Sequence, residues 1–334
     1  MSHMGKEARE APEAVARFLE INHRALVELG ARLRKAPPSM IISSARGSSD
    51  NAAGYFKYLT EIFLGVPCAS VGASVISVYD APLRLKGGLC ITISQSGQSP
   101  DIVALQEAAK KAGALTVALV NDEGSPAATN ADICLALQAG RELSVAATKS
   151  FIVSLVAGAA ITSHWLGDDK RIGILKALPD HLAKATRLEW PELIKLSSHA
   201  ESLYVLGRGP SLPVAEEIAL KLKETCAIHA EAYSIAEVMH GPLELLGEGF
   251  PIFALAPNDR ALSFSQGAFK KIRATGAELI VAGHGGLAFE ETGEPLFDPI
   301  TMIQTAYLAI EKVAVGLGRN PDRPRLLKKV TETF

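Results

Sequence analysis

The sequence predicts an α/β protein with two tandem, doubly wound parallel sheets. Short apolar runs alternate with helical stretches, which is the order of βαβ units and favours parallel sheets covered by helices on both faces. The same order of strand, turn and helix occurs in both halves of the chain. With 334 residues, 48% of them hydrophobic, the chain can bury a core in each half.

Each half of the sequence opens with an apolar run that ends in an Arg-Gly turn before a helix. The first run begins at Met40 and leads to the pair at 46–47, and the second begins at Leu203 and leads to the pair at 208–209. Two further strands recur in the same order, at 87–97 and 110–122 in the first half and at 247–258 and 273–285 in the second. The two domains are therefore expected to be internal repeats of one fold.

The stretches outside these repeats have helical periodicity. One covers residues 7–37 at the start of the chain, and another covers residues 165–202 between the two halves. The first four residues, MSHM, are typical of a cloning remnant, and we expect no functional role for them.

Charge and cysteine patterns exclude several classes of function. The 34 basic and 36 acidic residues are interspersed, which argues against nucleic acid or a membrane surface as a partner. No apolar run is long enough to span a bilayer, and the N-terminus lacks a signal-peptide pattern, so we expect a cytoplasmic protein. The four cysteines lie apart and no His, Asp or Glu cluster has ligand spacing, so we expect neither a metal nor another cofactor.

A turn rich in hydrogen-bond donors follows the third apolar run, in the stretch CITISQSGQSPD at 90–101. In open parallel sheets, ligands bind where strand ends meet helix N-termini. The side chains of Ser94, Gln95, Ser96 and Ser99 are suited to surround a dianionic phosphate at such a place. The same turn would also serve simply to cap the following helix. A P-loop lysine and a GxGxxG pattern are both missing here, which disfavours a nucleotide.

A second serine-rich turn, SSARGSSDN, occupies the equivalent place after the first strand. We expect Ser48 and Ser49 to close the phosphate site from the other side. Arg46 in the same turn is equally typical of a surface ion pair, and we assign it no role.

Four segments of the sequence are distinctive when taken together. They are SQSGQSPD, GRELSVAATKSF at 140–151, ALKLKETCAIHAEAYSIAEVMHGPLELL at 219–246, and DRPRLLKKVTE at 322–332. Collinear from about residue 40 to residue 332, they resemble the sugar isomerase half of glucosamine-fructose-6-phosphate aminotransferase, a tandem SIS-domain family. The resemblance implies flavodoxin-like SIS domains and a sugar phosphate substrate.

The resemblance also implies a division of the chain. We expect an N-terminal tag remnant and helix (1–37), a first, phosphate-binding SIS domain (38–166), a helical connector (167–200), a second, catalytic SIS domain (201–320) and a tail that reaches the active site (321–334).

Lys221 and Glu224 are three residues apart on an apolar helix and share one face with Glu217. On spacing alone, a surface ion pair is the simpler interpretation. The resemblance implies instead that Glu224 is the base that moves a proton between C1 and C2 of the sugar. Lys221 would then orient Glu224 or stabilise charge.

Two residues complete the implied catalytic set. His240 follows the helical-looking segment 233–239, and by resemblance it opens the sugar ring in the neighbouring subunit's site, which implies a homodimer. In the tail, alignment gives the family's lysine role to Lys329 rather than Lys328. Lys329 would form a Schiff base or stabilise the open-chain carbonyl.

The segment at 140–151 matches a sugar-contacting loop of the resembled family. The resemblance implies that Glu142, Val145 and Ala147 contact the sugar. Ala147 replaces the serine usual in that motif, so a backbone contact would persist there while a hydroxyl contact would be lost.

These residues lead us to expect an enzyme that converts a hexosamine 6-phosphate to a ketohexose 6-phosphate and ammonia. The resembled enzyme also has a glutamine-hydrolysing domain that this sequence does not contain, and deamination needs no such domain. Aldose–ketose isomerisation and glucosamine 6-phosphate synthesis with a separate glutaminase stay open. The sequence does not distinguish glucosamine, galactosamine or a deoxy-fructosyl amine conjugate as the substrate. A non-catalytic sugar-phosphate sensor matches less well, because the carboxylate and histidine are present and a DNA-binding helix-turn-helix is not.

Overall fold

The computed structural model describes residues 1–329 and confirms the two parallel sheets that the sequence predicts. The chain forms two compact units, which we call the five-stranded unit and the four-stranded unit. The five-stranded unit contains Ala11–Glu142, Lys149–Pro179 and, in the tail, Lys328 and Lys329. The four-stranded unit contains Met1–Glu10, Leu143–Thr148 and Asp180–Leu327.

The five-stranded unit has the strand order β2-β1-β3-β4-β5, with all strands parallel. Its strands are β1 (Ile41–Ser44), β2 (Cys68–Ser70), β3 (Leu89–Ser94), β4 (Leu115–Val120) and β5 (Ile133–Ala136). From β1 the chain adds β2 on one side and then β3, β4 and β5 on the other, so the direction of winding reverses between the neighbouring strands β1 and β3. Sheets with this order bind ligands at the carboxyl ends of the strands that flank the reversal.

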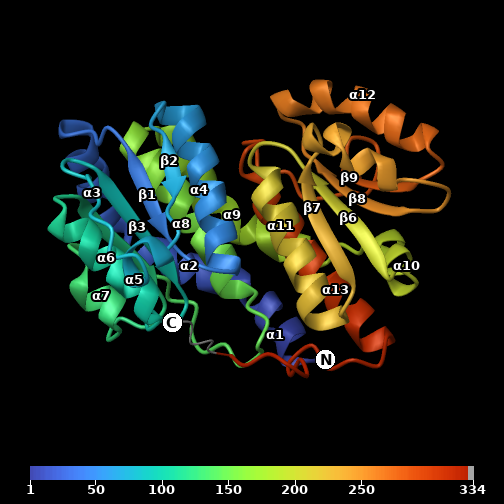
Figure 1. The fold of residues 1–334 in the computed structure, drawn as a ribbon, viewed down its shortest axis with the longest axis horizontal. Coiled ribbons are helices and arrows are strands. Elements are labelled where there is room, and N and C mark those ends of the chain that lie inside the picture. Colours follow the sequence, from blue (N-terminus) through green and yellow to red (C-terminus); the bar gives the residue numbers. More distant parts are fainter. Residues whose placement is uncertain (330–334) are drawn as a thin grey trace. The chain divides into compact units, whose positions relative to one another are not determined.

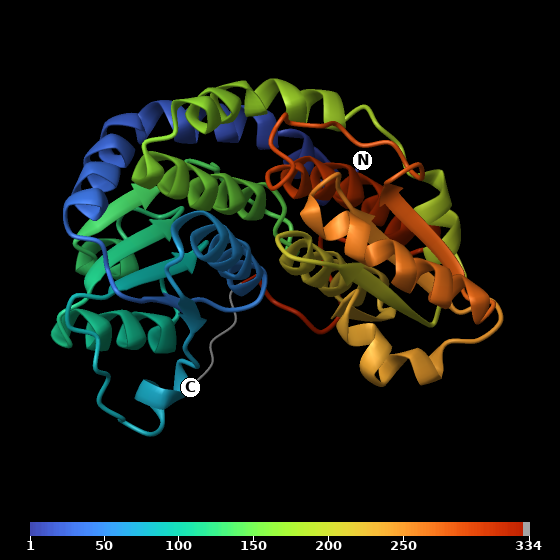
Figure 2. The same cartoon turned by 90° about the horizontal axis from the view of Figure 1, so that it is seen from above.

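Two groups of helices cover the faces of this sheet (Figure 2). On one face, α4 (Ser48–Leu64) packs against α8 (Lys149–Leu166), which also contacts α2 (Ala11–Ile21) and α3 (His23–Lys35). On the other face lie α5 (Ser74–Ser77), α6 (Pro100–Lys111) and α7 (Pro126–Asn130). Helix α8 is long and apolar enough to cross a membrane by length and composition, but 94% of it is buried. It is therefore the core helix of this unit.

The four-stranded unit repeats the same winding, with the parallel order β7-β6-β8-β9 (Figure 1). Its strands are β6 (Ser202–Gly207), β7 (His229–Ser234), β8 (Pro251–Ala256) and β9 (Glu278–Gly283). Its helices are α1 (His3–Arg9), α10 (Pro191–Ser198), α11 (Ser211–Lys221), α12 (Arg260–Ala274) and α13 (Asp298–Gly316). Helix α13 packs against α1, α10 and α11, and its buried face fixes the place of α11. Helix α9 (Asp169–Ala185) begins in one unit and ends in the other.

The structure differs from the sequence-based expectation just before His240. The segment 233–239 is not one helix, because Tyr233 and Ser234 end strand β7 and only Glu237–His240 forms a 3-10 turn. The ring of Tyr233 packs edge-on against Tyr204 of β6 at 5.0 Å, which holds this segment in the sheet. At the N-terminus, Met4 is fully buried and the Ser2 hydroxyl caps α1.

Candidate active site

The serine-rich turn after β3 lies at the reversal point of the five-stranded sheet. The Ser94 hydroxyl accepts a hydrogen bond of 3.0 Å from the Gly97 amide, and the Ser96 hydroxyl accepts one of 3.3 Å from Gln98. Gly97 has a φ of +65°, and a Cβ at this position would lie 2.1 Å from the Ser125 hydroxyl oxygen. Because only glycine fits here, the turn can bring its backbone amides close to a ligand.

Two helices begin beside this turn. Ser99 is the N-cap residue of α6, but its side chain caps no helix amide, so its hydroxyl is not used by the helix. Ser48 and Ser49 begin α4, which follows the neighbouring strand β1. The amino ends of two helices and the predicted serines thus share one edge of the sheet, an arrangement that attracts anions.

Arg46 lies in the same turn as Ser48 and is held by an acid. Its guanidinium lies 2.5 Å from the carboxylate of Asp101, near the start of α6. The Arg46 side chain is half-exposed and Asp101 is buried. This ion pair joins the turn after β1 to the helix after β3.

In the four-stranded unit, Lys221 lies between two carboxylates. Its Nζ is 2.5 Å from Glu224 Oε2 and 3.3 Å from Glu217 Oε1. The hydroxyl of Tyr307, on α13, donates a 2.9 Å hydrogen bond to Glu217. Glu217 and Lys221 are at most 1% exposed, so the interpretation as a surface ion pair is wrong.

The electrostatics of this cluster keep Lys221 charged. Burial opposes the charged ammonium, but the carboxylates of Glu217 and Glu224 outweigh burial and raise the pKa of Lys221 above its usual value. With one ammonium between two carboxylates, the ionised cluster carries one excess negative charge.

Glu224 is the member of the cluster that reaches solvent. Its side chain is 21% exposed, and it lies in a π-helical turn, Leu222–Cys226, that follows α11. Such turns often occur at functional sites. Glu224 also lines a cavity of about 580 Å³ within the four-stranded unit. The carboxylate is thus both anchored by Lys221 and accessible to a ligand.

His240 is not brought to Glu224 within this chain. It ends a 3-10 turn, is exposed, and precedes Gly241, which has a φ of 141°. Within residues 1–329, its side chain forms no hydrogen bond or ion pair, and it does not line the cavity beside Glu224. No group of three or more His, Cys, Asp or Glu in the same range is placed to hold a metal ion.

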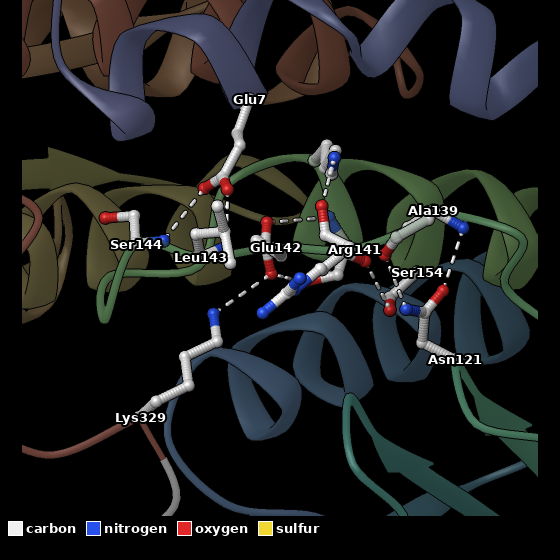
Figure 3. A network of polar contacts seen from close by, with 12 residues as sticks. Glu7, Asn121, Ala139, Arg141, Glu142, Leu143, Ser144, Ser154 and Lys329 are labelled. Atoms are coloured by element: carbon white, nitrogen blue, oxygen red, sulfur yellow. Dashed lines mark hydrogen bonds and ion pairs between the residues drawn. The ribbon is translucent and has the colours of Figure 1, made fainter.

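Figure 3 shows contacts of Glu142, Leu143 and Ser144, which belong to the loop predicted to contact the sugar. Glu142 is buried in the five-stranded unit, where its carboxylate accepts a 2.7 Å hydrogen bond from Ser150 and lies 3.5 Å from Lys329 Nζ. In the four-stranded unit, the amide of Val145 donates to the carbonyl of Asp322 at 3.2 Å. Ala147 is half-buried in the same loop.

Glu7, to which no sequence motif assigns a role, lies at this loop. The buried carboxylate of Glu7 accepts hydrogen bonds from the amides of Leu143 and, at 3.2 Å, Ser144 (Figure 3). Glu7 and Leu143 are 136 positions apart, and Tyr307 and Glu217 are 90 apart. No local motif could reveal either contact.

Comparison with known proteins agrees with this architecture. The SIS domain family profile matches residues 33–163 and 196–299. The glutamine–fructose-6-phosphate aminotransferases (isomerizing) of Bradyrhizobium diazoefficiens and Escherichia coli K12 are 33% identical over 353 and 362 residues. Each match covers 98% of this chain and 58% of the relative, so the chain spans little more than half the length of these curated relatives.

Solved structures match over nearly the whole chain. A candidate phosphosugar isomerase from Silicibacter pomeroyi is 43% identical, with a TM-score of 0.93 and coverage of 96% of this chain and 100% of that one. The C-terminal domain of glucosamine-fructose-6-phosphate aminotransferase from Francisella tularensis is 29% identical, with a TM-score of 0.84 and coverage of 97% and 98%. Glucosamine-6-phosphate deaminase from Thermotoga maritima shares the fold at 21% identity, with a TM-score of 0.80 and coverage of 99% and 100%. The chain therefore belongs to the SIS domain family and is an enzyme of the phosphosugar isomerase type.

Proposed function

We propose that this protein is an amino-sugar 6-phosphate deaminase and isomerase, which converts a hexosamine 6-phosphate to a ketohexose 6-phosphate and ammonia. The observation that carries the proposal is the buried ammonium of Lys221 between two carboxylates, one of which, Glu224, borders a cavity. A carboxylate that is anchored by a fixed charge and accessible to a ligand is suited to take a proton from carbon and return it.

In the proposed reaction, Glu224 takes the proton from C2 of the open-chain amino sugar and returns it to C1. The intermediate is an enolamine, and the second proton transfer leaves an imine at C2. Water adds to C2, the C2–N bond breaks, and ammonia leaves. Lys221 stabilises the charge on Glu224, while Lys329 stabilises the open-chain carbonyl.

The remaining predicted residues supply binding and ring opening. Serines of the two turns in the five-stranded unit bind the phosphate. His240, which is exposed, opens the sugar ring of a second subunit in a homodimer. We place the enzyme in the cytoplasm, where hexose phosphates are metabolised.

The relatives support an amino sugar over a plain aldose or ketose. The curated relatives are named for transfer of an amine to fructose 6-phosphate, and C–N cleavage is the reverse of C–N formation at the same carbon. Synthesis with a separate glutaminase would use the same base, so an assay must decide the direction. Aldose–ketose isomerisation needs only the proton transfer.

The test measures ammonia and ketose from glucosamine 6-phosphate and galactosamine 6-phosphate. Glu224→Gln keeps the size of the side chain but removes the proton acceptor, so we expect C1–C2 proton transfer to fall by ~10² to 10⁴. Solvent deuterium exchange into the sugar reports this step. Glu278→Gln, at an exposed position of β9, is the control variant.

Exchange at the wild-type rate in the Glu224→Gln variant would remove Glu224 from the mechanism. Interconversion of hexose 6-phosphates with no ammonia from any amino sugar would instead support the isomerase alternative.

A further inference from the structure

Helix α13 reaches the charged cluster of α11 through the hydroxyl of Tyr307. The two helices pack against each other in the four-stranded unit (Figure 1). Tyr307 is fully buried, and its hydroxyl donates a 2.9 Å hydrogen bond to Oε1 of Glu217, which is also fully buried. A buried tyrosine hydroxyl needs a hydrogen-bond partner, so this contact taken alone is compatible with a purely structural role.

The same oxygen of Glu217 also faces the ammonium of Lys221. Lys221 Nζ lies 3.3 Å from Glu217 Oε1 but 2.5 Å from Glu224 Oε2. The ammonium is thus shared unequally, and its closer contact is with the carboxylate that borders the cavity. Because Tyr307 donates a hydrogen bond to Glu217 Oε1, it offsets part of the negative charge with which Glu217 would otherwise attract Lys221.

The unequal sharing favours the form of Glu224 that can accept a proton. A carboxyl group must be ionised to act as a base, and a hydrogen bond from a charged donor stabilises its ionised form. Any change that moves Lys221 toward Glu217 therefore weakens Glu224 as a base and also loosens its position.

We propose that Tyr307 and Glu217 are positioning residues for Glu224, because the hydrogen bond from Tyr307 to Glu217 keeps the ammonium of Lys221 on the base. This inference rests on the proposed function, in which Glu224 moves the proton between C1 and C2. Tyr307 and Glu217 do not line the cavity and are fully buried, so they act through Lys221.

The elements packed around Glu224 carry further charged and titratable groups. The cations that line the same cavity are Lys223, Arg319 and Arg325. The other charged residues of α11 and α13 are Glu216, Asp298, Glu311 and Lys312. The titratable residues of β7, which also packs against the turn, are His229, Glu231 and Tyr233. None of these groups changes when Tyr307 or Glu217 is substituted.

The experiment follows protonation of the Glu224 carboxyl by carbon NMR, with Glu224→Gln to assign the signal. In Tyr307→Phe, Glu217 draws Lys221 away from Glu224, so we expect the midpoint of protonation to rise by about 0.5 to 1 pH unit. In Glu217→Gln the competing carboxylate is gone, so the midpoint should fall by a similar amount. The double variant should behave like Glu217→Gln, because Tyr307 then has no carboxylate to act on.

The matched control is Thr305→Val, which removes another buried hydroxyl of α13. The Thr305 hydroxyl donates a 3.1 Å hydrogen bond to the carbonyl of Ala185 instead of to the cluster, so the midpoint of Glu224 should stay at the wild-type value. Shifts in opposite directions distinguish positioning from a general loss of stability. An unmoved midpoint in Tyr307→Phe, or a shift in the same direction in both single variants, would overturn the inference.

The pH dependence of solvent deuterium exchange into glucosamine 6-phosphate separates this inference from the proposed function. We expect the acid limb of the exchange rate to follow the NMR midpoint in each variant. If the midpoints move as stated but exchange is absent or keeps its wild-type pH profile, the positioning role stands and the proposed function fails. If the midpoints do not move while Glu224→Gln abolishes exchange, the proposed function stands and the positioning role is wrong.

Discussion

Lys221 places a charged ammonium, 1% exposed, inside the four-stranded unit. A buried ammonium is strongly unfavourable unless it is paired and its partners are hydrogen-bonded. Glu217 and Glu224 provide the pairing, and the hydroxyl of Tyr307 provides a further hydrogen bond to Glu217. The cluster therefore ties α11 to α13 while it holds the proposed base.

Removing the charge of Lys221 should destabilise the protein. Lys221→Met keeps much of the side-chain volume but leaves two carboxylates facing each other, so we expect the free energy of unfolding to fall by ~3 to 5 kcal/mol. Urea denaturation measures this change. Lys223→Met, at an exposed neighbouring position, should alter the same free energy by no more than about 0.5 kcal/mol. An unchanged urea midpoint in Lys221→Met would contradict the stated role of the charge.

The hydroxyls of Ser94 and Ser99 should contribute mainly to substrate binding. The double variant Ser94→Ala/Ser99→Ala loses hydrogen bonds to a phosphate worth ~1.5 to 3 kcal/mol each, so KM should rise more than kcat falls. Steady-state kinetics separate the two constants. Ser263→Ala, on exposed surface of α12, should leave both unchanged. If KM of the double variant equalled that of the wild type, the phosphate would have to bind elsewhere.

At the scale of elements, the two sheets differ in how one equivalent helix begins. The strand order reverses between β1 and β3 in one sheet and between β6 and β8 in the other, and the helices concerned follow β3 and β8. Helix α6 begins after Ser99, whose side chain makes no capping bond, whereas α12 begins after Asp259, whose carboxylate accepts a 2.8 Å hydrogen bond from Ala261. The amino end of α12 therefore already has a carboxylate against it. The acid in the first turn of α6, Asp101, is instead paired with Arg46, so we propose that the phosphate binds at α6 rather than at α12.

The loop Leu143–Thr148 is another element whose place depends on distant residues. Its amides donate to Glu7 and to the carbonyl of Asp322, and the Ser144 hydroxyl lies 3.4 Å from the carbonyl of Pro321. Both ends of the chain thus contribute to the position of a loop predicted to contact the sugar.

Weakening the Glu7 contact should raise KM. Glu7→Ala removes the acceptor for two loop amides, and we expect KM to rise by about 10-fold with a smaller change in kcat. Glu7→Gln retains one acceptor oxygen and should recover part of this loss. The control is Glu13→Ala at an exposed position of α2. If Glu7→Ala lowered the melting temperature but left KM unchanged, Glu7 would support only the fold and not substrate binding.

Much of this architecture could be predicted because its signals are local. The apolar runs that become β1, β3, β4, β6 and β8 are continuous, as expected for strands buried on both faces. Strand β2 has three residues, two of them exposed, and offers no such pattern. The spacing of Lys221 and Glu224 predicts a shared helix face, but their burial depends on α13, whose packing on α11 no local pattern encodes.

For the whole molecule, the homodimer predicted from the family resemblance can be tested by mixing variants. His240 does not line the cavity beside Glu224 of its own chain. If His240 serves the site of a second subunit, each site combines Glu224 of one chain with His240 of the other, so Glu224→Gln and His240→Asn remove residues from different chains. A dimer with one chain of each kind then retains one intact site. After denaturation and refolding of an equal mixture, we expect about a quarter of wild-type activity, since about half of randomly paired dimers are mixed. Activity no higher than the sum of the two variants refolded separately would place His240 and Glu224 in sites of the same chain.

Each compact unit is assembled from three separate stretches of the chain, a fact that bears on how the gene can be divided. A fragment that begins near residue 201 would carry all strands of the four-stranded sheet but would lack helix α1 and the loop Leu143–Thr148, both of which that unit contains. The complementary fragment would carry those two pieces without the surfaces that bury them. The repeats of this sequence can thus be recognised as two modules, but neither half-gene encodes a complete one, and co-expression of both halves would be needed to restore either.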